Sequence, residues 1–193
     1  MADWDLVGTN AHYDWGVHNP IANGGNTAGQ WRTLTSDEWE YIINGRPNAH
    51  NLQGWATVNG VRGMVLLPDN WTSPTGITFA NTHTQATSNY AQNVYDTTQW
   101  ALMEAAGAVF LPTSGTTAEN SYPGSYWSST CYRPNTIFQS WTSSANYLYW
   151  NVNIYTEEPG YYLYTSPNSS IIYYPSIYSA GKSSNKFVRL VKD

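Results

Sequence analysis

The stretch Leu34-Thr35-Ser36-Asp37-Glu38-Trp39-Glu40-Tyr41-Ile42-Ile43-Asn44-Gly45 predicts a helix with defined ends. Thr35 and Glu38 have capping-box spacing, in which each side chain accepts a hydrogen bond from the backbone N–H of the other residue. Gly45 follows the apolar residues as a stop signal, because glycine readily adopts the left-handed conformation that ends helices. We therefore expect a helix over residues 36–43. Three apolar residues share its inner face: Trp39, Ile42 and Ile43.

A second helix is predicted over residues 97–106 by the same kinds of signal. Asp96 and Gln99 have the spacing of another capping box, and Gly107 supplies the stop. Three apolar residues recur at helical spacing along this segment: Trp100, Met103 and Ala106.

Strands are predicted between and after the helices. Ala56-Thr57-Val58 and Met64-Val65-Leu66-Leu67 flank Asn59-Gly60, a dipeptide typical of tight hairpin turns. After residue 112 the pattern alternates, and four later segments have the composition of strands, the last of them apolar enough to be buried. They cover residues 147–155, 161–164, 171–174 and 187–191. Early helices followed by an antiparallel sheet indicate the α+β class, and no linker divides the chain, so we expect one domain over residues 1–193.

The last third of the chain is rich in tyrosine. Residues from Tyr122 onward carry 12 of the 16 tyrosines, interleaved with Ser, Asn, Thr and Ile. Tyrosine offers a large, rigid contact area with a polar tip, and Ser and Asn add adaptable hydrogen bonds, so this composition is typical of recognition surfaces. Two runs stand out: Cys131-Tyr132-Arg133-Pro134-Asn135-Thr136-Ile137-Phe138 and Ser169-Ser170-Ile171-Ile172-Tyr173-Tyr174-Pro175-Ser176-Ile177-Tyr178-Ser179.

Charge, cysteine content and hydropathy narrow the classes of protein. The formal net charge is −5, and the 8 Lys and Arg residues are scattered along the chain. Binding to a nucleic-acid backbone requires clustered cations, so we expect no nucleic-acid partner. Cys131 is the one cysteine, so no intrachain disulfide can form. No stretch has the length and apolarity of a membrane span, and residues 1–5 lack the features of an export signal. We expect no membrane insertion.

Five motifs follow one another in the order typical of a known fold. They are Trp31-Arg32-Thr33-Leu34-Thr35-Ser36-Asp37-Glu38-Trp39-Glu40-Tyr41, Asn44-Gly45-Arg46, Gly60-Val61-Arg62-Gly63-Met64-Val65-Leu66-Leu67-Pro68-Asp69-Asn70-Trp71, Gly124-Ser125-Tyr126-Trp127-Ser128-Ser129-Thr130 and Val188-Arg189-Leu190-Val191. Together they resemble the formylglycine-generating-enzyme branch of the C-type lectin fold. Within this branch the chain resembles paralogous bacterial surface proteins and the variable proteins of diversity-generating retroelements. A fold hosts many functions, so this resemblance is more specific for fold than for function.

The resemblance implies a C-type lectin fold with two helices and antiparallel sheets, in which N- and C-terminal strands pair and the segments after residue 130 display the binding face. In retroelement variable proteins, adenine-directed mutation converts Asn codons into codons for residues such as Tyr, Ser, Thr and Ile, but never Lys, Glu, Gln, Met or Trp. Both tyrosine-rich runs obey this restriction at every position. A surface paralogue that is not diversified also fits, and both alternatives stay open.

The expected function is ligand or receptor binding on a bacterial surface or at a phage tail. The partner would be a protein or glycan on another cell, and oligomerisation stays open. The alternation around Trp150 places Leu148 and Trp150 inward and Tyr147 and Tyr149 outward. The predicted ligand-binding residues are Tyr132, Arg133, Asn135, Ile137, Phe138, Tyr147, Tyr149, Ser170, Ile172, Tyr173, Tyr174, Ser176, Ile177 and Tyr178.

Two alternatives belong to other functional classes: an assembly protein with a fixed aromatic subunit interface, and an enzyme on the same fold. Oxidation as in formylglycine-generating enzymes needs a cysteine pair, which the single Cys131 excludes. Glu157 and Glu158 are adjacent in the sequence, so their side chains would point apart on an extended strand. We therefore expect a solvated acidic turn here rather than a calcium site. The histidines are spread out without metal-ligand spacing; they are His12, His18, His50 and His83. We expect no catalytic residue, no cofactor and no metal.

Overall fold

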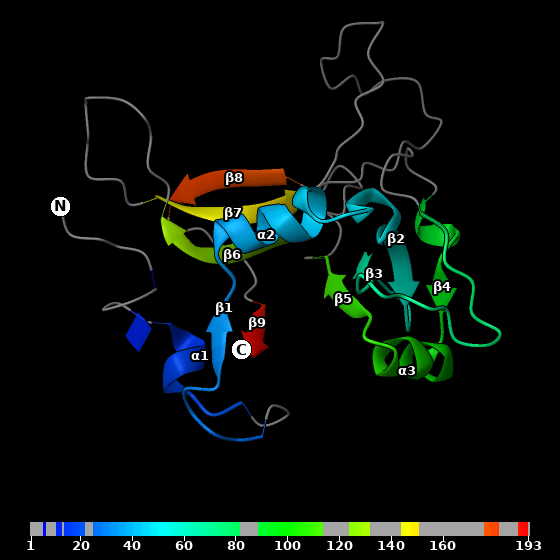
Figure 1. Ribbon diagram of the computed structural model, residues 1–193, viewed down its shortest axis with the longest axis horizontal. Coiled ribbons are helices and arrows are strands. Elements are labelled where there is room, and N and C mark those ends of the chain that lie inside the picture. Colours follow the sequence, from blue (N-terminus) through cyan, green and yellow to red (C-terminus); the bar gives the residue numbers. More distant parts are fainter. Residues whose placement is uncertain are drawn as a thin grey trace, which may run out of the picture. The chain divides into compact units, whose positions relative to one another are not determined.

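The computed structural model describes residues 6, 11–12, 14–21, 25–81, 89–113, 124–131, 144–150, 176–181 and 189–192. It contains short helices and small sheets, which confirms the predicted α+β class (Figure 1). The chain divides into two compact units. The first unit comprises Met1–Ile42, Ser125–Tyr149 and Ser176–Asp193, and the second comprises Ile43–Gly124 and Trp150–Pro175.

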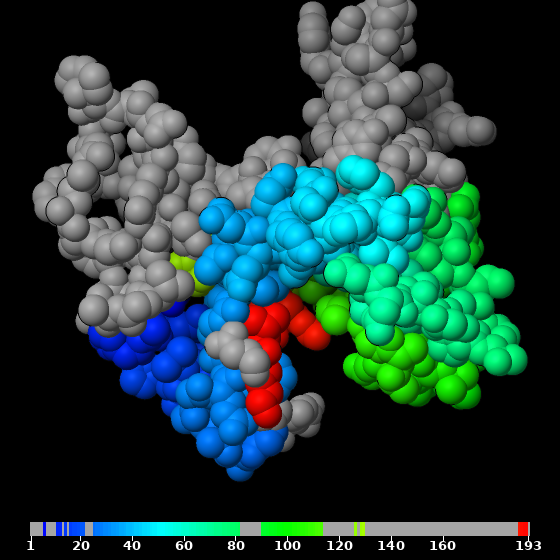
Figure 2. Space-filling model, viewed as in Figure 1, coloured from blue at the N-terminus to red at the C-terminus, as the bar shows by residue number. Residues whose placement is uncertain are grey.

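The first unit holds two small sheets and two short helices. A two-stranded sheet pairs β1 with β9 antiparallel, so the expected pairing of N- and C-terminal strands is observed; Figure 2 shows β9 in red alongside blue β1. A three-stranded sheet has the order β6-β7-β8. The elements are α1 (Trp15–His18), β1 (Trp31–Thr33), α2 (Ser36–Glu40), β6 (Gly124–Cys131), β7 (Ser144–Trp150), β8 (Ser176–Gly181) and β9 (Leu190–Lys192).

The first predicted helix is confirmed, with a change of winding along it. Thr35 and Glu38 form the capping box that their spacing predicts. The α-helical part α2 ends at Glu40, and the chain continues as a π-helical turn, η3 (Tyr41–Gly45). Of the predicted inner face, Trp39 and Ile43 are buried and Ile42 is half-buried.

The second unit is built on a mixed sheet with the strand order β4-β2-β3-β5. The predicted hairpin is confirmed: β2 and β3 are antiparallel, and Asn59 and Gly60 turn the chain with φ angles of 50° and 80°. Positive φ at both central residues matches the twist of a two-residue hairpin and explains the Asn-Gly pair. The elements are η4 (Ala49–Asn51), β2 (Gln53–Val58), β3 (Val61–Leu66), η5 (Asn89–Ala91), β4 (Val94–Tyr95), α3 (Thr97–Ala105) and β5 (Val109–Pro112).

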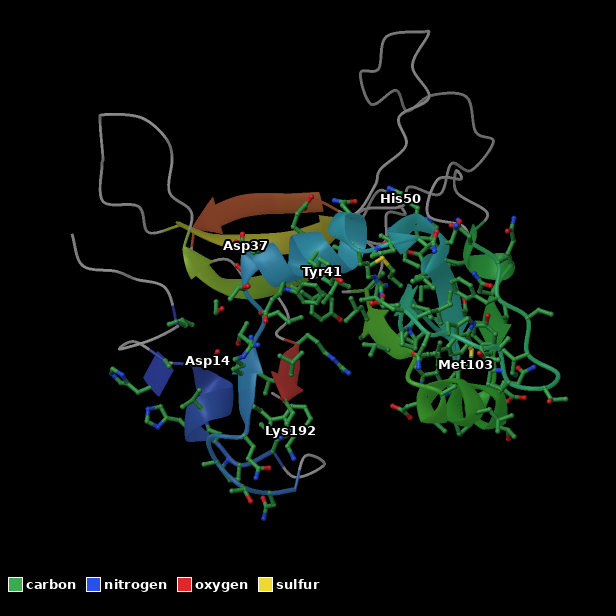
Figure 3. All side chains as sticks on the ribbon, viewed as in Figure 1. Asp14, Asp37, Tyr41, His50, Met103 and Lys192 are labelled. Atoms are coloured by element: carbon green, nitrogen blue, oxygen red, sulfur yellow. The ribbon has the colours of Figure 1, made fainter. Side chains whose placement is uncertain are left out.

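The second predicted helix is also confirmed, as α3. Its capping box of Asp96 and Gln99 is formed. Met103 is fully buried and extends from α3 toward the sheet (Figure 3). Ala106, the third member of the predicted face, is exposed, because the helix ends at residue 105 and the chain turns there; Ala108 is buried instead.

Both faces of the mixed sheet are buried, so its strands do not alternate between polar and apolar residues. One face, with Ala56, Val58, Val65 and Tyr95, packs with Met103 of α3. The opposite face is formed by side chains that are also buried: Gln53, Trp55, Met64 and Leu111.

A glycine lets β5 approach β3 closely. A Cβ atom at Gly63 would lie 2.4 Å from the backbone oxygen of Leu111 and 2.5 Å from the Phe110 ring. No side chain fits at such distances, so the ring of Phe110 occupies the space that a larger residue at position 63 would need.

The strands expected in the last third are only partly observed. The strand predicted over residues 147–155 is present as β7, which begins at Ser144; residues 151–155 lie outside the described residues, as do the strands predicted over 161–164 and 171–174. A strand directly after Pro175, β8, was not predicted; proline is tolerated at the start of a strand. The closing strand was expected to be buried, but Leu190 and Val191 in β9 are half-buried, because β9 has a paired strand on one side only among the described residues.

Candidate functional site

The sheet β6-β7-β8 carries the described part of the predicted binding surface. β7 and β8 are antiparallel, and their register pairs Tyr147 with Tyr178 and Tyr149 with Ser176. Residues paired across two strands lie on one face of a sheet, as do residues two positions apart on one strand. These four residues therefore share a face, and we call them the tyrosine face.

Ile177 does not belong to the tyrosine face. It pairs with Leu148, so it lies on the opposite face, to which the alternation pattern assigns the interior. The prediction grouped Ser176, Ile177 and Tyr178 as neighbours in one binding run. The strand register separates them, because a run of consecutive residues on a strand is divided between its two faces.

The tyrosine face lies between the points where the two tyrosine-rich runs join the sheet. β6 ends at Cys131, where the first run begins, and β8 begins at Ser176, within the second run. Figure 1 shows β6 and β8 pointing in the same direction, so Cys131 and Ser176 lie at opposite ends of the sheet. The other predicted ligand-binding residues lie outside the described residues: Tyr132, Arg133, Asn135, Ile137, Phe138, Ser170, Ile172, Tyr173 and Tyr174.

Tyr126 anchors this sheet to α2. Its ring is 3 % exposed, and the ring centroid lies 6.3 Å from that of Trp39. Burial raises the pKa of the Tyr126 hydroxyl, and the positive charge of Arg189 opposes this rise. The phenol is therefore neutral at physiological pH, and its role is packing. The backbone of Ser129 adds a second link, since its N–H donates to the carbonyl of Leu34 at 2.8 Å.

A salt bridge fixes the start of α2. Arg32 donates from both terminal guanidinium nitrogens to the two carboxylate oxygens of Glu38, at 2.8 and 2.7 Å. Glu38 also accepts from the backbone N–H of Thr35 at 2.8 Å. The hydrogen bond with Arg32, the backbone hydrogen bond and the charge of Arg32 outweigh desolvation and lower the pKa of Glu38 to about 2.

The stability that Glu38 contributes should depend on pH. A carboxylate whose pKa is lower in the folded state stabilises the fold above its unfolded pKa, here 4.5, and loses this effect as the pH falls toward the folded pKa of about 2. The difference in unfolding free energy between wild type and Glu38→Gln should be constant at neutral pH and shrink between these two values. Urea titrations across this range measure it.

The matched control for this pH dependence is Glu104→Gln, which removes the same charge from an exposed position on α3. It corrects for the general effect of one carboxylate on the acid stability of the chain. If the two variants followed the same pH profile, the link between Arg32 and Glu38 would not account for the effect.

Asp14 joins α1 to β1 and was missed in the sequence. It is fully buried, and its two oxygens accept from the N–H of Gly16 at 3.1 Å, the N–H of Thr33 at 2.7 Å and the hydroxyl of Thr33 at 3.0 Å. Figure 3 shows Asp14 between α1 and β1. An Asp just before a short helical segment is a recognisable N-cap signal. The hydrogen bonds between Asp14 and Thr33 could not be predicted, because residues so far apart form no local sequence motif.

Asn93 is the corresponding buried link in the second unit. Its side chain is 1 % exposed; Oδ1 accepts from the N–H of Ala80 at 2.8 Å, and Nδ2 donates to the carbonyls of Ala80 and Trp55, each at 2.8 Å. The Tyr95 hydroxyl lies 3.2 Å from Oδ1 and 2.8 Å from the carbonyl oxygen of Thr78. Asn93 thereby joins the loop around residue 80 to β2.

Two of the histidines lie closer together than their sequence spacing suggested. The ring centroids of His12 and His18 are 6.5 Å apart, and the two ring planes are nearly perpendicular. His50 is exposed in η4, and His83 lies outside the described residues. Among the residues that the structure describes, no group of three or more His, Cys, Asp or Glu side chains could hold a metal ion.

Across the described ranges, no helix has both the length and the apolar character needed to cross a membrane. Comparison with protein-family models, with curated proteins and with solved structures finds no match to this chain.

Proposed function

We propose that the chain is a ligand-binding domain of the C-type lectin fold and that it recognises a protein or glycan on another cell. It would act on a bacterial surface or at a phage tail. The observation that carries this proposal is the register of β7 and β8, which gathers Tyr147, Tyr149 and Tyr178 with Ser176 on one face. Aromatic rings beside small hydroxyl side chains are the composition of protein recognition surfaces.

The position of this face within the sheet supports the same proposal. The two tyrosine-rich runs join the sheet at its opposite ends, at Cys131 and Ser176. The tyrosine face lies between these two ends. Tyr126 of β6 and Trp39 of α2 pack together and are buried, which holds this sheet to α2.

The binding role predicts a loss of affinity when the rings of the tyrosine face are removed. Tyr147, Tyr149 and Tyr178 are replaced together with Ser, and binding is measured to the tightest ligand obtained from a displayed random-peptide library or a printed glycan array. We expect at least about a thirtyfold loss, since aromatic anchors at interface centres are worth about 2 kcal/mol or more. The melting temperature should stay nearly unchanged.

Tyr41→Ser is the matched control, because Tyr41 is 52 % exposed and lies on η3, outside the tyrosine face. Its affinity should equal that of wild type. A triple variant that binds normally would contradict the proposal. A large fall in its melting temperature would show that the rings stabilise the fold, and a stable wild-type oligomer that dissociates in the triple variant would favour a fixed subunit interface.

We further propose that the tyrosine-rich runs are diversified by a retroelement. Their composition supports this, because both runs lack every residue type that adenine-directed mutation of Asn codons cannot produce. Sequencing the DNA around the gene tests it. A near-copy of the 3′ coding end beside a reverse-transcriptase gene is the expected result, and its absence would favour a surface paralogue with a fixed binding face.

A further inference from the structure

The turn between β2 and β3 presents an Asn-Gly pair to solvent. Asn59 and Gly60 are both exposed, and they form a two-residue connection between Val58 and Val61. A Cβ atom placed on Gly60 would meet nothing within 4 Å. Gly60 has no side chain, and no other atoms lie close to its Cα on the side where a side chain would be. Its backbone nitrogen is therefore accessible.

The side-chain amide of Asn59 is held by the first residue of α3. The hydroxyl of Thr97 donates a hydrogen bond to Oδ1 of Asn59 at 2.9 Å, and the backbone N–H of Asn59 donates to the carbonyl of Tyr95, also at 2.9 Å. A donor on Oδ1 withdraws electron density from the amide carbon and stabilises the negative charge that develops on this oxygen when a nucleophile attacks.

We propose that Asn59 is a site of self-catalysed deamidation in the folded protein. The backbone nitrogen of Gly60 loses its proton to solvent base and bonds to Cγ of Asn59, the C–N bond of the side-chain amide breaks, and the departing nitrogen leaves as ammonia. The resulting succinimide ring is opened by one water molecule at either carbonyl, which yields aspartate or isoaspartate. The reaction needs no oxidant, reductant or cofactor.

A second Asn-Gly pair in the same chain provides a contrast. Asn44 and Gly45 close the π-helical turn η3, where backbone amides are bonded to carbonyls five residues earlier. Attack by the Gly45 nitrogen requires that helical turn to open first. Of the three Asn-Gly dipeptides in the chain, the one at Asn59 therefore lies in an exposed turn and the one at Asn44 in a helical turn.

The products would alter the junction between the hairpin and α3. Aspartate adds a negative charge next to Asp96, the N-cap of α3, whose neighbour Thr97 holds Asn59. Isoaspartate adds a methylene group to the backbone of a connection that is only two residues long, so the pairing of Val58 with Val61 would be disturbed.

The test incubates the intact chain at mildly alkaline pH and measures aspartate and isoaspartate at Asn44 and Asn59 by peptide mapping and mass spectrometry. In native protein, Asn59 should react at least about ten times faster than Asn44, since the helical site must first break a hydrogen bond and unwind. In urea, where both dipeptides are unfolded, the two rates should be similar. Equal native rates, or no product at Asn59, would overturn the proposal.

The contribution of Thr97 is tested with Thr97→Val and Thr97→Ser in the same assay. Valine keeps the shape but removes the donor, and we expect native deamidation at Asn59 to slow about fivefold, as for one hydrogen bond of about 1 kcal/mol. Serine should restore the wild-type rate. Rates in urea should be the same for all three proteins; a Thr97→Val rate equal to wild type in native protein would overturn the role of the hydroxyl.

Discussion

Replacing Asn93 with Ala should lower the free energy of unfolding by about 3–4 kcal/mol, the largest effect we expect from a single polar residue in the second unit. The side chain makes three hydrogen bonds of 2.8 Å to the backbone of Ala80 and Trp55 in a site that is 1 % exposed. Alanine would leave two carbonyls and one N–H without these partners, and an unsatisfied buried polar group costs about 1–3 kcal/mol. Urea unfolding monitored by tryptophan fluorescence measures the change.

Two further variants make this expectation specific. Asn93→Asp keeps the acceptor for the N–H of Ala80 but places a carboxylate oxygen against two carbonyl oxygens, so it should be at least as destabilising at neutral pH. Asn51→Ala removes an exposed amide that accepts one hydrogen bond, from Asn81, and should change stability by less than about 0.5 kcal/mol. A wild-type stability for Asn93→Asp would contradict the role assigned to the Nδ2 donors.

In the first unit, Asp14→Ala should lower the free energy of unfolding by about 3 kcal/mol. The buried carboxylate satisfies two backbone N–H groups and one hydroxyl, and hydrogen bonds to a charged group contribute about 1.5–3 kcal/mol each, part of which is offset by the cost of burying the charge. Because Thr33 belongs to β1, which pairs with β9, hydrogen exchange of amides in these two strands should accelerate together.

Asp37→Ala is the control for Asp14→Ala. Asp37 lies in the first turn of α2 in the same unit, is exposed, and is labelled with Asp14 in Figure 3. Its loss removes only a favourable interaction with the helix terminus, about 0.3–1 kcal/mol. If the two substitutions had equal effects, the buried hydrogen bonds of Asp14 would contribute nothing beyond its charge.

The helices and the hairpin could be predicted because their signals are local. The capping boxes of α2 and α3 join residues three positions apart, and the Asn59-Gly60 turn is decided by two adjacent residues. The buried links could not be predicted in this way. Asp14 and Thr33 are separated by 19 positions and Asn93 and Trp55 by 38, and one sequence does not reveal which distant backbone groups a side chain will meet.

The candidate site was predicted in composition but not in arrangement. Alternation along β7 placed Tyr147 and Tyr149 on one face, and the structure agrees. The pairing of β8 with β7 places Tyr178 on this face and Ile177 on the opposite one. This pairing joins segments that are far apart in the chain. The start of β8 was not predicted because it directly follows Pro175, and a proline within an aromatic run was interpreted as the end of a strand rather than its beginning.

The length of the three-stranded sheet bears on the size of the ligand that we propose. Cys131 and Ser176 mark opposite ends of a sheet whose middle strand has seven residues, and seven residues of extended chain span about 20 Å. A single sugar ring is much smaller than this distance. Under the binding function that we propose, a partner that contacts the whole length of the sheet would be an extended oligosaccharide or a folded protein.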